Sequence, residues 1–251
     1  MLAASAVSAL AADLPARTYS KAPVAVVAPI YDWSGIYIGG AVGGEWDTTN
    51  GNFYNAPGFL WRTNGDGRGI YGGFAGIQKQ WGSFVLGLEG GWNGLGNDFS
   101  STAAGGFGAP CGYVAGAQSC QSRIRDIGYI GGRAGYAWNR FMVYGQAGYA
   151  QARIDTQGLA NATNTAFSLT SATHGGWYAG VGADYAVLDY LILGLDYKHY
   201  EFDSKQHSCT VGALNCGAPA DNRNVSAKSD AVMGRVSFKF NPWPTAVVAK
   251  Y

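Results

Sequence analysis

The sequence has few charged residues. Asp, Glu, Lys and Arg together make up 13% of its 251 residues, against about a quarter in typical soluble domains. The formal net charge is only +1, so the chain lacks the strong basic field that attracts nucleic acid or other polyanions. We therefore expect no nucleic-acid partner, and something other than a charged surface must solvate the fold.

Long hydrophobic runs are also missing. After the first dozen residues, no stretch offers the roughly 18 uninterrupted apolar residues that a membrane helix needs. Hydrophobic residues nevertheless make up 47% of the chain, aromatic residues make up 14%, and there are 39 Gly residues. In a membrane, the alternative to helices that satisfies every backbone N–H and C=O group is a closed β-barrel. The composition therefore favours an all-β membrane protein.

The two ends of the chain differ from its centre. Residues 1–11 resemble the tail of a secretory signal peptide that ends in the A-x-A site Ala9–Ala11, and a short helix is the alternative. Because no Lys or Arg precedes this site, we expect the translation start to lie upstream. Residues 12–32 contain three prolines and no periodic pattern, which predicts a periplasmic linker. The barrel is then expected at 33–240, followed by a periplasmic extension at 241–251.

From Trp33 onward, apolar residues alternate with small or polar ones in eight segments, as they do in membrane-spanning strands. The connections between these segments are alternately long and short, which is typical of bacterial outer-membrane barrels. The sequence thus predicts an all-β, eight-stranded antiparallel up-and-down transmembrane β-barrel in the outer membrane of a Gram-negative cell, with both termini periplasmic. The predicted strands are Ser34–Asp47, Gly69–Trp81, Phe84–Phe99, Arg125–Trp138, Phe141–Thr156, Gly175–Leu188, Tyr190–Asp203 and Ser229–Phe240.

Aromatic and charged residues support this arrangement. A periplasmic aromatic girdle is predicted at the short-turn ends of the strands, and it consists of Trp81, Trp138, Tyr190 and Phe240. Charged residues share the small, Gly-rich face, whereas a soluble barrel would carry them outside. This face gives a predicted lumen polar network of Glu45, Glu89, Arg133, Asp184, Asp196, Arg235 and Lys239. An eight-stranded lumen is only wide enough for side chains, so these charges should pair, either as a structural plug or as a gated ion path.

The four cysteines form two local pairs in the second and fourth predicted outer loops. The pairs are Cys111 with Cys120 and Cys209 with Cys216. An even cysteine count in an exported chain predicts disulfides. A zinc site near His207 is the alternative, but the cysteine spacing is wider than the usual C-x-x-C. We expect neither a metal nor a cofactor.

No catalytic constellation stands out. The glycine run Gly39–Gly44 lies in the middle of a predicted strand and not at a phosphate-binding strand-to-helix junction. A lipid-modifying hydrolase would need a His beside a Ser or an acid. His174 lies near Ser171 at a predicted loop end, and His199 falls on the lipid-facing side of its strand. We expect no enzyme activity, with hydrolysis as a minor alternative.

Several fragments, in order, resemble a known family. They are AADLP near the start, Tyr31–Gly39, Phe84–Gly90, Arg133–Ala137 and the closing strand. With them the chain resembles the small outer-membrane immunogenic proteins of alphaproteobacteria, relatives of the eight-stranded OmpA-like barrel, over its mature length. The resemblance implies a polar, mostly filled lumen and antigenic surface loops, and some relatives are linked to haem binding or host adhesion. In this family the last strand normally ends the chain on an aromatic residue, whereas here residues 241–251 follow Phe240.

Together these features predict a structural outer-membrane barrel that contributes to envelope integrity, with at most porin-like permeability to small solutes. The expected partners are outer-membrane lipids, lipopolysaccharide and the barrel-assembly machinery. The alternative makes the loops the active part, as a surface for adhesion or for a haem-type ligand, with a host surface ligand as the partner.

Overall fold

The computed structural model describes residues 31–242, apart from 54–55, 66, 97–99, 102–117, 161–162, 164 and 208–222. No helix in this part of the chain is long and apolar enough to cross a membrane. The strands are β1 (Gly35–Phe53), β2 (Ala56–Asn64), β3 (Arg68–Trp81), β4 (Phe84–Leu95), β5 (Ser100–Ser101), β6 (Gln118–Trp138), β7 (Phe141–Ala160), β8 (Thr165–Ala186), β9 (Leu191–His207) and β10 (Arg223–Phe240).

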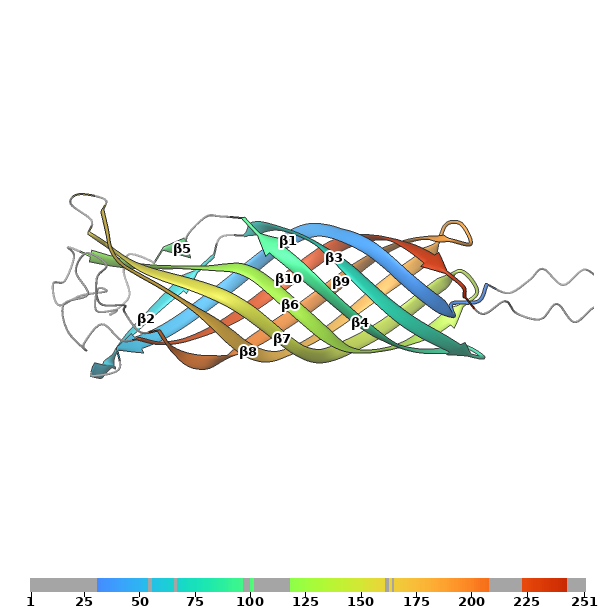
Figure 1. The fold of residues 1–251 in the computed structure, drawn as a ribbon, viewed down its shortest axis with the longest axis horizontal. Coiled ribbons are helices and arrows are strands. Elements are labelled where there is room, and N and C mark those ends of the chain that lie inside the picture. The colour runs from blue at the N-terminus through green and yellow to red at the C-terminus, as the bar shows by residue number, and fades with distance from the viewer. Residues whose placement is uncertain are drawn as a thin grey trace, which may run out of the picture.

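The strands form one closed antiparallel barrel (Figure 1). The order of the paired strands is β10-β9-β8-β7-β6-β4-β3-β1, and β10 closes the sheet by pairing with β1 from Ile36↔Phe240 to Phe53↔Arg223. Strand β1 pairs with β3 up to Glu45↔Arg68 and then with β2, so β2 continues the line of β3. In the same way, β5 follows β4 along β6. The prediction of an eight-stranded antiparallel barrel is therefore confirmed.

The two ends of the barrel differ. At one end, which we call the turn end, the connections are Gly82-Ser83, Asn139-Arg140 and residues 187–190. Gly82 (φ 60°) and Asn139 (φ 53°) adopt the left-handed conformation that tight turns require and that Gly and Asn tolerate best. The opposite end, which we call the loop end, carries the longest connections, which join β4 to β6 and β9 to β10. Figure 1 shows the turn end at the right.

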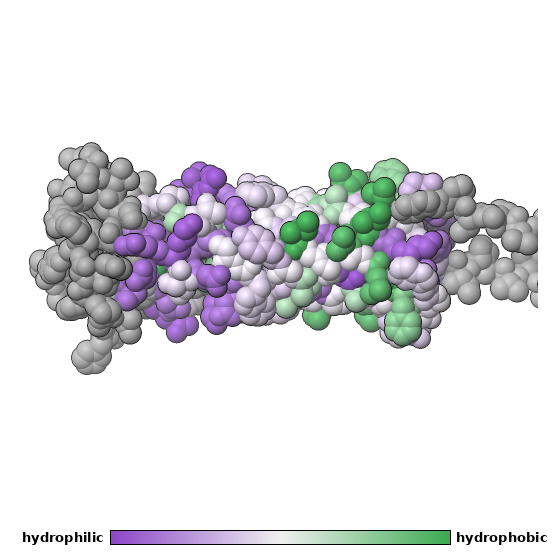
Figure 2. Space-filling model, turned by 60° about the horizontal axis from the view of Figure 1, so that its bottom comes forward, coloured by the Kyte–Doolittle hydropathy of each residue, from purple (hydrophilic) through white to green (hydrophobic). Residues whose placement is uncertain are grey.

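Apolar side chains lie on the outside of the barrel. Ile38, Leu88 and Val181 are 56%, 60% and 61% exposed, whereas Tyr37 and Glu89, one residue away from Ile38 and Leu88, are almost fully buried. Figure 2 shows hydrophobic residues gathered over the half nearer the turn end and hydrophilic residues toward the loop end. The fold thus has an apolar exterior band, and its charged residues lie inside together with a buried apolar cluster that includes Ile70, Ile127 and Phe202. A soluble barrel would instead carry its charges outside.

Strands are longer at the loop end than the sequence predicts. Strand β1 continues to Phe53, β8 begins at Thr165, and β2 occupies part of the predicted loop Thr48–Arg68. These predicted limits were wrong because outward-facing residues beyond the apolar band are polar as well, so the alternation that marks a membrane strand fades there. In the other direction, β4 ends at Leu95, four residues before the predicted limit.

Some predictions fall where the structure gives no test. The predicted signal peptide, most of the linker and most of the C-terminal extension lie outside the described residues. Cys120 belongs to β6, and the other three cysteines lie outside the described part of the chain. Both disulfides therefore remain predictions.

Candidate functional site: the lumen of the barrel

Six charged side chains meet in the middle of the lumen, and we call them the central layer. They come from five strands: Glu89 (β4), Arg133 (β6), Asp184 (β8), Asp196 and Lys198 (β9), and Arg235 (β10). Each stands beside a glycine on a neighbouring strand, for example Glu89 opposite Gly76 and Gly131. Because glycine has no side chain, it leaves room for the long charged side chain beside it, which explains the Gly-rich inner face.

Arg235 connects two acidic residues of the central layer. Its Nη2 donates to Glu89 Oε2 at 2.7 Å, and its Nη1 donates to Asp196 Oδ2 at 2.9 Å. The guanidinium carbon also lies 4.0 Å from the centre of the Phe74 ring. A bidentate guanidinium–carboxylate contact fixes both position and orientation, so Arg235 is held from two sides and from one face.

Arg133 and Lys198 complete the central layer. Arg133 forms an ion pair with Asp184 and a longer one with Glu89 at 3.4 Å, and its guanidinium lies 3.6 Å from the Tyr144 ring centre. Lys198 Nζ donates to Asp196 at 2.5 Å. Glu89 also accepts hydrogen bonds from the Tyr37 and Tyr129 hydroxyls at 2.9 and 3.2 Å.

The central layer is electrically balanced and buried. It contains three acidic and three basic side chains, each at most 4% exposed. Burying an unpaired charge costs several kcal/mol, so this balance is what makes the arrangement tolerable inside the barrel. These mutually paired side chains occupy the middle of an eight-stranded lumen, which is about wide enough for side chains alone.

A second charged group lies between the central layer and the loop end. Arg68 Nη2 donates to Asp47 at 2.9 Å and to Glu45 at 3.2 Å, and Ser229 Oγ donates to Glu45 at 2.6 Å. Glu45 was predicted to share one network with the other lumen charges, but its ion-pair partner is Arg68. Arg68 lies one residue before the predicted strand Gly69–Trp81 and was therefore expected in a loop, whereas β3 begins with it.

The chain preceding β1 covers the turn end of the lumen. Trp33 is fully buried, and its indole Nε1 donates to the Asn139 carbonyl at 2.9 Å. Its backbone N–H donates to Gln80 Oε1, and its carbonyl accepts from Gln78, both at 2.7 Å. Together with Tyr31, which packs edge-on against it, Trp33 forms a stopper that we define as residues Tyr31–Ser34.

Lys239 contacts this stopper and does not belong to the central layer. Its Nζ donates to the Asp32 carbonyl and lies 3.9 Å from the Tyr31 ring centre. The structure therefore distributes the seven predicted lumen residues over three levels. Five are in the central layer, while Glu45 lies toward the loop end and Lys239 toward the turn end.

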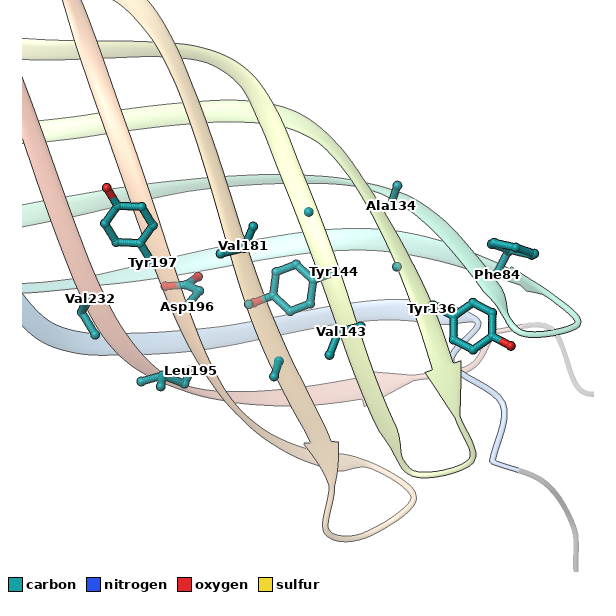
Figure 3. Close-up of a pocket in the computed structure, with 14 residues that line it drawn as sticks. Phe84, Ala134, Tyr136, Val143, Tyr144, Val181, Leu195, Asp196, Tyr197 and Val232 are labelled. Atoms are coloured by element: carbon teal, nitrogen blue, oxygen red, sulfur yellow. The ribbon is translucent and has the colours of Figure 1, made fainter.

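Outside the barrel, the four predicted girdle residues all lie at the turn end. Trp81, Trp138, Tyr190 and Phe240 are each more than half exposed. Between this ring and the middle of the barrel, a shallow groove of about 880 Å³ crosses β6 to β9 (Figure 3). Its lining includes Val143, Val181 and Leu195, and such an apolar exterior suits lipid acyl chains and not water.

The three histidines occupy different environments. His199 lies on the outer surface, where its Nδ1 is 2.7 Å from Asp230. His174 and His207 are buried inside the loop end of the barrel, with their Nε2 atoms 2.7 Å apart. In the described residues, no group of three or more His, Cys, Asp or Glu side chains could hold a metal ion.

Comparison with known proteins assigns the chain to a family. The model of the outer membrane protein beta-barrel domain family matches residues 1–240. This chain belongs to that family. A 22 kDa outer membrane protein of Rhizobium leguminosarum bv. viciae is 29% identical over 197 residues, which are 77% of this chain and 75% of the relative. A 31 kDa outer-membrane immunogenic protein of Brucella melitensis is 27% identical over 215 residues, covering 80% and 83%.

Among solved structures, this outer-membrane barrel is similar to the outer membrane protease OmpT of Escherichia coli. The TM-score is 0.47 at 10% identity, with 82% of this chain and 97% of the other covered. The family match and the relatives support an outer-membrane location for the barrel, whose apolar band then faces lipid.

Proposed function

We propose that this outer-membrane barrel is a closed structural component of the cell envelope, with at most a small permeability to solutes. The observation that carries the proposal is the central layer, in which Arg235 bridges Glu89 and Asp196 across the lumen. The Tyr31–Ser34 stopper supports the same conclusion, because Trp33 fills the turn-end mouth independently.

The proposed orientation has the turn end and both termini in the periplasm and the long loops outside the cell. It rests on the short connections at the turn end, since outer-membrane barrels have short periplasmic turns and longer outer loops. A peptide tag inserted between β7 and β8 should be accessible to antibody on intact cells, and a tag at the C-terminus should not. The opposite labelling pattern would overturn this orientation.

A role in envelope integrity is tested in cells that lack the protein. Loss of the chain should increase sensitivity to detergents and to large antibiotics that an intact outer membrane excludes. Wild-type protein should restore resistance. A barrel in which a short turn replaces residues 208–222, the connection between β9 and β10, should restore it equally, because the proposal assigns this role to the barrel. Restoration only by the protein with complete loops would favour the adhesion alternative.

That alternative has one structural observation in its favour. Strands β1, β7 and β8 extend beyond the apolar band toward the loop end, so the barrel presents its loops well above the lipid. The proposed partners there are lipopolysaccharide and, for adhesion, a host surface ligand. Adhesion would be supported by loss of cell binding after loop deletion, with barrel assembly unchanged.

The non-enzymatic assignment is also part of the proposal. His174 was the residue considered for lipid hydrolysis, and its side chain is fully buried with Nδ1 2.9 Å from the Asp203 carbonyl. A lipid cannot reach a side chain in that position without a rearrangement of the strands. A lipid-deacylation assay on purified barrel should therefore give the same background for wild type and His174→Ala.

A further inference from the structure

Strands β8 and β9 separate toward the loop end. Their ladder runs from Ala186↔Ile192 only as far as Gly176↔Phe202. Beyond that point, β8 continues to Thr165 paired with β7, and β9 continues to His207 paired with β10. We call the facing edges, Thr165–Gly175 and Asp203–His207, the β8–β9 seam. An unpaired strand edge leaves backbone groups without ladder partners, so other groups must hold it.

Side chains bridge the seam where the backbone does not. His174 on β8 has its Nδ1 2.9 Å from the Asp203 carbonyl of β9, and its Nε2 2.7 Å from His207 Nε2. Lys205 Nζ of β9 donates to the Thr173 carbonyl at 2.7 Å. Both imidazole rings are at most 1% exposed, so water does not compete for these contacts.

In the neutral pair, the hydrogen bonds select one tautomer of each ring. A carbonyl only accepts, so His174 carries its proton on Nδ1 and its Nε2 must accept. His207 then carries its proton on Nε2, and its Nδ1 accepts from the hydroxyls of Thr156 and Thr170, each 3.3 Å away. The two hydroxyls are 2.8 Å apart and complete the chain. Every ring nitrogen is thus matched while both histidines are neutral and buried.

A third ring proton places a positive charge on a pair of rings that are at most 1% exposed, close to the positive charge of Lys205. A fourth ring proton sets two N–H donors against each other at a separation of 2.7 Å. Among the groups that face the pair, β9 contributes the acid Asp203 and the base Lys205, while Thr156 of β7 and Thr170 of β8 do not titrate. On β10, Arg223 is the ladder partner of His207.

His174 lies three residues beyond Trp177, on the loop side of the exposed aromatic residues and outside the membrane-spanning band. Burial lowers the pKa of His174 below its ordinary value of 6.5. The unfolded or opened state therefore binds the proton more readily than the closed one. The contribution of the neutral His174 ring is complete above about pH 6.5 and is lost as the pH falls below that value.

We propose that His174 and His207 form a proton-sensitive clasp that holds the β8–β9 seam shut at neutral pH and releases it in acid. Release lets the loop-end parts of β8 and β9 move apart and admits water to that part of the lumen. The central layer contains no histidine, so the lumen below stays closed. The clasp is thus a response of the outer rim to external acidity, independent of solute conduction.

The test measures the width of the seam directly. Spin labels are attached through a ketone-bearing amino acid at Ser171 and Ser204, which are exposed on the two edges, so the native cysteines stay unchanged. Electron–electron distances in the full chain, in lipid nanodiscs, should shift to longer values between about pH 7.5 and about pH 5. Labels at Gln151 and Ser171, across the paired β7–β8 ladder, should show no shift.

Variants assign the shift to the pair. His174→Gln with His207→Gln removes both titratable rings and should abolish the pH response, while His199→Gln should leave it intact. No shift in wild type, or an equal shift in the double variant, would overturn the proposal. If the double variant does not fold, ring ¹⁵N shifts of wild type decide the matter. They should show the Nδ1–H form of His174 and the Nε2–H form of His207 at neutral pH, and any other pair of forms contradicts the clasp.

Discussion

Arg235 Nη2 lies 2.7 Å from Glu89 Oε2, although the two residues are 146 positions apart in the sequence. Strands β3 and β1 lie between β4 and β10 in the sheet, so this contact crosses the lumen and does not belong to a strand ladder. It ties opposite walls of the barrel together, and both side chains are at most 2% exposed. The interior therefore depends on mutual pairing more than on any single residue.

Replacing Glu89 by Gln should destabilise the barrel strongly. The change leaves two guanidinium groups with one fewer carboxylate, and removing one partner of a buried pair costs about 3–5 kcal/mol. Urea unfolding in lipid vesicles measures the loss of unfolding free energy. The matched control is Glu201→Gln, which breaks the exposed Lys228–Glu201 pair and should cost at most about 1 kcal/mol. Equal losses in the two variants would contradict a cooperative central layer.

Alternation alone could predict which residues face the lumen, because a strand with one lipid-facing side repeats every two residues. It could not predict partners. Glu45 pairs with Arg68 and not with the central layer. The register of β1 against β3 places these two residues opposite each other. Lys198 occupies an inward-facing position of its strand, as the alternation predicts. Its contact with Asp196 depends on the conformations of the two side chains inside the lumen.

Adjacent glycines of β6 should respond oppositely to enlargement. A Cβ on Gly131 would lie 2.3 Å from the Ala147 carbonyl oxygen and 2.5 Å from the Tyr178 hydroxyl, whereas a Cβ on Gly132 meets nothing within 4 Å. Gly131→Ala should therefore lower the unfolding free energy by about 1–3 kcal/mol through overpacking. Gly132→Ala should be neutral or slightly stabilising. Similar effects at both positions would mean that the inner and outer faces are wrongly assigned.

A charge on the outer face should be costly in a depth-dependent way. Val181 lies midway between Trp177 and Tyr185 on β8 and is 61% exposed. Val181→Arg should cost about 2–4 kcal/mol, and Trp138→Arg, at the turn-end ring, about 0–1 kcal/mol. Refolding titrations into vesicles compare the two. A smaller loss at Val181 than at Trp138 would contradict the proposed membrane position.

The stopper should contribute to stability independently. Trp33→Ala removes a fully buried indole and its bond to Asn139, which should cost about 3–5 kcal/mol. Trp81→Ala, on the lipid-facing side, is the control and should cost less. The difference is measured by denaturant unfolding of purified barrel. If Trp33→Ala is as mild as Trp81→Ala, the segment before β1 does not close the turn end.

Two features lay beyond prediction for physical reasons. Trp33 was expected only as the first residue of the barrel. The stopper, Tyr31–Ser34, has four residues, which are too few to show a periodic pattern. The burial of Trp33 comes from contacts with turns that are distant in the sequence, such as the one at Asn139. His174 and His207 are 33 positions apart, and nothing in the sequence marks the end of the β8–β9 ladder. A seam is defined by where pairing stops, and pairing is a tertiary property.

The central claim is that paired charges close the lumen, and single-channel recording in planar bilayers tests it most directly. Wild-type barrel should give at most rare, small openings, because Glu89, Arg133 and Arg235 remain paired. A variant in which all three are replaced by Ala, together with Trp33→Ala, should conduct steadily if it folds. A large steady conductance from the wild-type protein would contradict the account.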